Sequence, residues 1–78
     1  MSIAKLKTLL TQGIEEDLSY LELRVHLIDF KEQGGDQKDA ISVLEGLHKT
    51  TPDENWKDKI LELMDLTEGQ GIKALRVW

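Results

Sequence analysis

The sequence predicts an all-α fold of about four short helices, with an apolar C-terminal tail packed across them. Two helix-start patterns recur: Ser19 is followed three residues later by Glu22, and residues 51–54 read Thr-Pro-Asp-Glu. Each pattern precedes a run in which apolar residues fall at the three-to-four-residue spacing of a helix. Glycines follow each run, as they do at many helix C-termini.

The first helix is expected over residues 2–12, capped by Ser2 and closed by Gly13. Four apolar residues recur in it at helical spacing: Ile3, Leu6, Leu9 and Leu10. Three acids follow, Glu15, Glu16 and Asp17. They predict a solvated connector whose charge suits the N-terminus of the next helix.

Residues 20–33 are consistent with two structures. Apolar and polar residues alternate over 21–27, which is typical of a half-buried strand. A strand over 21–30 would have to pair with residues 72–78, and an isolated two-stranded ribbon is only marginally stable. The Ser19 start pattern and the following Gly34-Gly35 favour a helix, which is the prediction; an α+β fold with that ribbon is the alternative.

As a helix, residues 20–33 carry two apolar stripes, because successive side chains turn by about 100°. The members of one stripe are Leu21, Val25 and Ile28, and those of the other are Tyr20, Leu23, Leu27 and Phe30. So wide an apolar arc fits a central helix between two neighbours. It equally fits a helix with one stripe in the core and the other in a protein interface.

The third helix is expected from an N-cap at Asp36 to Lys49. Gly46 lies inside it and costs about 1 kcal/mol relative to alanine. Close approach of another helix would explain this glycine, and tolerance of a small defect is the alternative.

The fourth helix is expected to start at Thr51, with Pro52 in its first position, and to run to about Glu68. Its apolar face is formed by Trp56, Ile60, Leu63, Met64 and Thr67. The glycines of 69–71 end it. The tail that follows is apolar at Ile72, Leu75, Val77 and Trp78, so we expect it to be held against the core or offered to a partner.

Composition narrows the range of functions. Residues 1–78 are enough for one domain, and without cysteine it has no disulfides. A net charge of −5 disfavours nucleic acid as a partner. No apolar run reaches the roughly 20 residues of a membrane span, and no secretion signal precedes the first helix, so a cytoplasmic protein is expected. His26 and His48 lack metal-ligand spacing, and we expect no catalytic residues, metal or cofactor.

These features predict a non-enzymatic protein–protein interaction module. Its suggested form is a small acidic bacterial or phage inhibitor, of the immunity type, that binds a basic partner. The expected contact residues are Tyr20, Leu23, Leu27, Phe30 and Trp78, rimmed by Glu15, Glu16 and Asp17.

Two alternatives remain. The same surface could join two copies in a homodimer. A carrier or accessory role could instead use Ser19, because a small, acidic, helical chain resembles acyl carrier proteins in bulk properties. Those proteins attach their prosthetic group to the serine of an Asp-Ser-Leu motif, whereas residues 17–19 here read Asp-Leu-Ser.

Overall fold

The computed structural model describes residues 1–70 and 73–78, and it is all-α within them. The helices are α1 (Ile3–Glu15), α2 (Tyr20–Glu32), α3 (Gln37–Thr50) and α4 (Glu54–Thr67), followed by a short 3₁₀ helix, η1 (Lys73–Leu75). The described residues contain no strand, so the helical prediction for residues 20–33 is confirmed and the ribbon alternative is wrong. Gly71 and Ile72, which were assigned to the helix end and the tail, lie outside the described residues.

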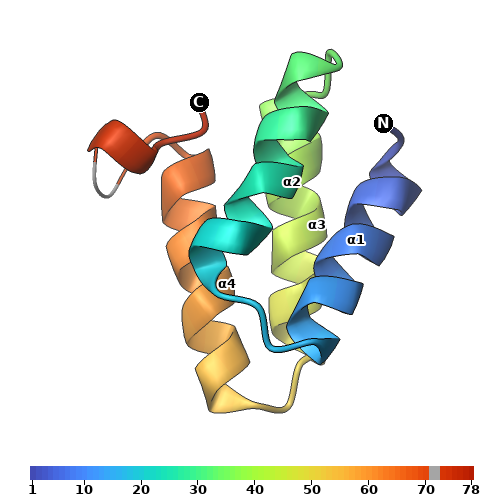
Figure 1. The fold of residues 1–78 in the computed structure, drawn as a ribbon, viewed down its shortest axis with the longest axis vertical. Helices are drawn as coiled ribbons and strands as arrows, with labels where there is room; N and C mark the ends of the chain where they lie inside the picture. The colour runs from blue at the N-terminus through green and yellow to red at the C-terminus, as the bar shows by residue number, and fades with distance from the viewer. Residues whose placement is uncertain (71–72) are drawn as a thin grey trace.

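The four helices form a bundle in which the chain direction alternates from one helix to the next (Figure 1). Helix α1 packs against α2 and α3, and α4 packs against the same two helices. Helix α2 therefore lies between α1 and α4, and the surface that it turns away from the bundle meets no other helix.

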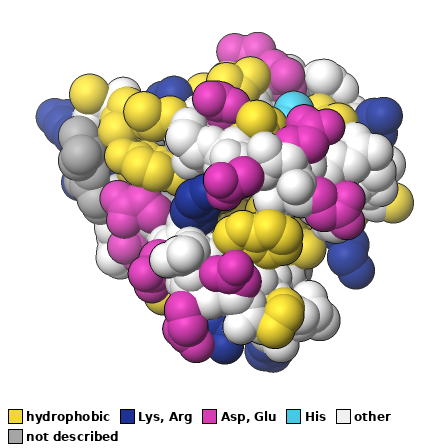
Figure 2. Space-filling view, turned by 60° about the horizontal axis from the view of Figure 1, so that its bottom comes forward, with side chains coloured by type: hydrophobic (Ala, Val, Ile, Leu, Met, Phe, Trp, Pro, Cys, Tyr) yellow, Lys and Arg dark blue, Asp and Glu magenta, His cyan; other side chains and the backbone are white. Residues whose placement is uncertain are grey.

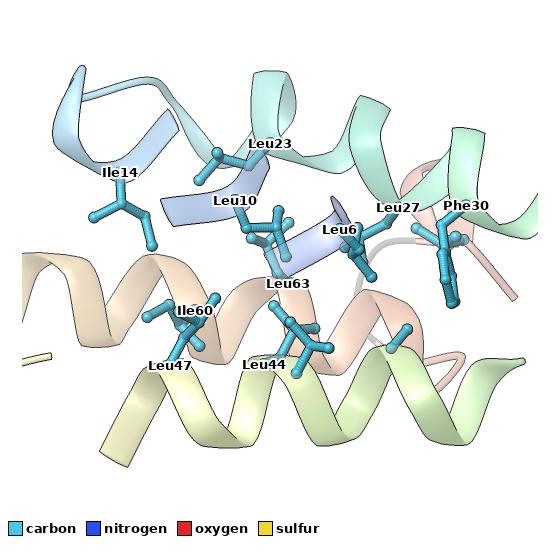
Figure 3. Close-up of a cluster of buried hydrophobic side chains, with 13 residues drawn as sticks. Leu6, Leu10, Ile14, Leu23, Leu27, Phe30, Leu44, Leu47, Ile60 and Leu63 are labelled. Atoms are coloured by element: carbon cyan, nitrogen blue, oxygen red, sulfur yellow. The ribbon is translucent and has the colours of Figure 1, made fainter. Parts of the chain in front are cut away.

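The core lies on the common axis of the bundle and draws side chains from every helix (Figure 3). Its members are large and aliphatic, with one aromatic ring: Leu6, Leu10, Ile14, Leu23, Leu27, Phe30, Val43, Leu44, Leu47, Ile60, Leu63 and Val77, together with Ala40. Complete burial of each of the larger side chains contributes about 1.5–3 kcal/mol. Burial of these side chains holds the helices together.

Three of the expected N-caps are confirmed. The hydroxyl oxygens of Ser2 and Ser19 accept backbone N–H groups at 3.1 and 3.3 Å, and a carboxylate oxygen of Asp36 accepts one at 2.9 Å. These bonds satisfy donors that a helix start otherwise leaves unpaired.

The expected cap at Thr51 is wrong. Helix α3 extends to Thr50, so Thr51 is its C-cap, and its N–H is bonded to the carbonyl of Leu47. Asp53 caps α4 instead and accepts the N–H of Asn55 at 2.8 Å. Thr51 is already part of the end of α3, so it does not also cap α4. Asp53 follows two residues later and is at least as good an N-cap as threonine.

Helices α1, α2 and α4 share one kind of ending: a residue of positive φ follows each of them, and the chain changes direction there. Gly34 and Gly69 occupy this position after α2 and α4. After α1 the residue is Asp17, with φ of 57°, and the N–H of Leu18 closes the turn on the carbonyl of Gly13 at 2.9 Å. This is the hydrogen-bond pattern of a Schellman motif.

The expectation that Gly13 ends the first helix is therefore wrong, because α1 continues to Glu15. Gly13 is buried at the crossing with α2, where a Cβ would stand 2.3 Å from the side chain of Leu23. Close approach of another helix was expected at Gly46 and is absent there: apart from the neighbouring residues and nearby backbone of α3 itself, no atom of the described chain lies within 4 Å of a Cβ built on Gly46.

The C-terminal segment packs against the bundle, as predicted, beside the end where α4 finishes (Figure 1). The N–H of Val77 is bonded to the carbonyl of Leu66 on α4 at 3.0 Å. From α2, Lys31 Nζ donates to the carbonyl of Val77 at 2.7 Å, and Arg24 Nε donates to that of Leu75. The tail is thus held to both α2 and α4.

Candidate interaction surface

Most of the expected contact stripe of α2 faces the core of the bundle and not the solvent. Leu23 and Leu27 are 0% exposed and Phe30 is 2% exposed, all within the core. The prediction that these three side chains are exposed at the surface is therefore wrong. The reason is the crossing at Gly13, which brings α1 against the Leu23 side of α2 and leaves the other stripe outside.

Tyr20 and Trp78 are half-buried and pack against the edge of the core. Lys31 Nζ lies 5.9 Å from the centroid of the Trp78 ring, within the range of a cation–π contact. Both aromatic side chains retain some exposed surface, and their contact with a partner stays a prediction.

The second stripe of α2 is the one that reaches solvent. Leu21 is 45% exposed and Val25 is 50% exposed, and Ile28, one turn further along, is half-buried. These three residues are called the outer stripe. They recur at i, i+4 and i+7, so their side chains form one continuous ridge along the helix.

The outer stripe differs from the other exposed apolar side chains. Among the described residues, two more large apolar side chains are exposed to a similar extent, Ile3 on α1 at 48% and Leu61 on α4 at 46%. Each stands alone on its helix, as single exposed apolar residues commonly do. Only α2 presents two of them one turn apart.

One edge of the outer stripe is acidic. By the helical rotation, Glu22 and Asp29 lie beside Val25, on the edge that faces away from the tail. These two residues are called the acidic edge. Within residues 1–70 and 73–78 the ion pairs are Lys57–Glu54 and Lys59–Asp17, so neither carboxylate of the acidic edge is neutralised by one.

The opposite edge of the stripe carries the cations of α2. Arg24 and Lys31 lie there and donate to tail carbonyls, as described above. Their side chains are held against the tail, so positive and negative charge are separated across the stripe.

The predicted acidic rim lies at the C-terminal end of α1. Glu15 is the last residue of α1, Glu16 is its C-cap, and Asp17 follows in the positive-φ position. The three acids therefore lie at the C-terminus of a helix, where negative charge is unfavourable, and not at the N-terminus of the next one. Asp17 pairs with Lys59 Nζ at 3.0 Å, and the same ammonium donates to the carbonyl of Leu18 at 3.3 Å.

The hydroxyl of Ser19 acts as the N-cap of α2. The described residues hold no cluster of three or more potential metal ligands and form no pocket. None of the helices in residues 1–70 and 73–78 has the length and apolar character needed to cross a membrane.

The space-filling view shows how charge is spread over one face of the molecule (Figure 2). Carboxylates are distributed across it among hydrophobic side chains, and lysine and arginine are scattered between them. The distribution agrees with a composition of 15 acidic and 10 basic side chains.

Comparison with known proteins gives no relative. No protein-family model, no curated protein and no solved structure is significantly similar to this chain.

Proposed function

We propose that this chain is a non-enzymatic protein-interaction module that docks another protein on the outer stripe of α2. The observation that carries the proposal is the pair Leu21 and Val25, about half exposed and one turn apart, on a helix that buries Leu23, Leu27 and Phe30 of its other stripe in the core. Helix α2 has more apolar surface than the bundle buries.

The exposed halves of Leu21 and Val25 are available to be covered by a partner. Covering the remaining surface of one leucine or valine contributes about 1 kcal/mol, given about 1.5–3 kcal/mol for complete burial. Ile28 adds a smaller share because it is already half-buried. A small set of such side chains supplies the apolar centre of an interface, and surrounding polar residues form its rim.

The form that size and charge support is a small acidic inhibitor that covers a basic target. The chain has 78 residues and a net charge of −5, and opposite charge on the target would raise the rate of association.

Site-specific photo-crosslinking tests the proposal. A photoreactive amino acid replaces Val25 in one variant and Leu61 in a matched variant, since the two side chains are similarly exposed on different helices. Both variants are expressed in the source cells and irradiated. We expect a defined adduct from position 25, absent from position 61, which disappears when Leu21→Ser is added to the position-25 variant.

Two outcomes contradict the proposal. One is the same set of adducts from both positions, which indicates collision without a preferred surface. The other is the absence of any adduct from position 25 in cells where the folded chain accumulates. An adduct with twice the mass of the chain indicates self-association, and the partner is then a second copy of this chain and not a different protein.

A further inference from the structure

We infer that the occupant of the outer stripe is an amphipathic helix of a partner protein, with apolar residues on one face and lysine or arginine beside them. The inference rests on the proposed function and specifies the kind of segment that docks.

The outer stripe is a ridge on a single helix, and it extends over seven residue steps, or about 10 Å along the axis. Apolar ridges of this kind pack into the grooves between side chains on a second helix. An α-helix has no unpaired backbone donors or acceptors along its side, so a partner strand could not add to α2 through its main chain. Recognition on α2 therefore depends on side chains, as in helix-on-helix packing.

The carboxylates of Glu22 and Asp29 flank the stripe and form no ion pair with any described residue, whereas Arg24 and Lys31 are held on the tail side. A docked helix would place its own flanking side chains over the acidic edge. Lysine or arginine there meets opposite charge, and glutamate or aspartate meets like charge.

Charge also favours a foreign basic helix over a second copy of this chain. Each copy carries a net charge of −5, so self-association brings two acidic surfaces together. An anionic lipid surface meets the same repulsion. A basic helix meets neither cost, and it covers the same apolar ridge.

The test uses the full chain and a defined probe. The probe is a helical peptide of about 18 residues, or five turns, built from leucine on one face and lysine elsewhere. A matched peptide has glutamate in place of every lysine. Each is titrated into the isotope-labelled protein, and backbone amide shifts are followed by NMR at low and at physiological salt.

Binding of the leucine–lysine peptide should shift amides along α2, with an affinity that falls as salt is raised. Leu21→Ser/Val25→Ser should weaken it about tenfold or more, since it removes both exposed apolar side chains of the outer stripe. Glu22→Gln/Asp29→Asn should weaken it several-fold. Two matched controls, Ile3→Ser/Leu61→Ser and Asp58→Asn/Asp65→Asn, change exposed residues of the same types elsewhere and should leave the affinity within twofold.

The inference is overturned if the leucine–glutamate peptide binds as tightly as the leucine–lysine peptide. It is also overturned if neither peptide shifts α2, or if Glu22→Gln/Asp29→Asn has no more effect than its control pair. In each of these cases a crosslinked partner at position 25 leaves the proposed function standing. Failure of the crosslink removes the proposed function itself, so the two failures are distinguishable.

Discussion

Gly13 of α1 lies so close to Leu23 of α2 that a Cβ at position 13 would stand 2.3 Å from Leu23 Cδ2. The same Cβ would stand 3.3 Å from a methyl carbon of Leu18. A side chain at position 13 would require the Leu23 side chain or the two helices to shift. The contact fixes which side of α2 faces inward, and so it leaves Leu21 and Val25 outside.

Gly13→Ala should therefore destabilise the fold. Alanine is a better helix former than glycine by about 1 kcal/mol, but overpacking at a closed contact costs about 1–3 kcal/mol. Because Leu23 is fully buried, its side chain has little room to move aside. Urea unfolding followed by circular dichroism should give a lower free energy of unfolding than for the unmodified chain.

Gly46→Ala is the matched substitution and should have the opposite effect. Gly46 is helical and exposed, and the described chain leaves open space where its Cβ would be. Alanine there gains helix propensity without a clash, so the free energy of unfolding should rise by about 1 kcal/mol. Equal changes in stability for the two alanine variants would contradict the account of the α1–α2 contact.

Asp53→Ala tests the corrected start of α4. Loss of the carboxylate that accepts the Asn55 N–H should lower the free energy of unfolding by about 1 kcal/mol. Asp53→Asn should retain most of the stability, because asparagine caps equally well. Thr51→Ala should cost less than Asp53→Ala, and the reverse order in thermal or urea unfolding would restore Thr51 as the cap.

Lys31→Met should loosen the C-terminal segment while keeping most of the aliphatic bulk at position 31. The substitution removes the donor to the Val77 carbonyl and the cation near the Trp78 ring. A loss of about 1 kcal/mol in local stability corresponds to roughly fivefold faster exchange of the Val77 amide, which is bonded to Leu66. Lys7→Met changes an exposed lysine of α1 and should leave that exchange rate unchanged.

Local signals made much of the fold predictable from the sequence. Ser2, Ser19 and Asp36 act as caps because their side chains bond to N–H groups two or three residues away, and neighbouring sequence is enough to reveal this. The cap of α4 was misplaced by two residues because Thr51 and Asp53 are both competent, and the length of α3 decides between them.

The orientation of α2 depends on contacts that the sequence does not reveal. Helical spacing gave its two apolar stripes correctly, but both contain large aliphatic residues, so nothing local shows which one is buried. The deciding feature is the position of Gly13, whose role as a close contact looks the same in the sequence as a helix stop. The sequence also does not show whether Gly46 is a close contact or a tolerated defect in its helix. Its exposed position, with open space around a Cβ, fits the tolerated defect.

The central claim is that the two stripes of α2 have separate roles, one in folding and one in binding. It is tested most directly by measuring the stability of Leu21→Ser/Val25→Ser and its affinity for the partner crosslinked at position 25. We predict a loss of no more than about 2 kcal/mol in the free energy of unfolding, because only about half of each side chain is covered in the fold, with affinity reduced about tenfold or more. A loss of several kcal/mol in stability, or an affinity equal to that of the unmodified chain, would contradict the claim.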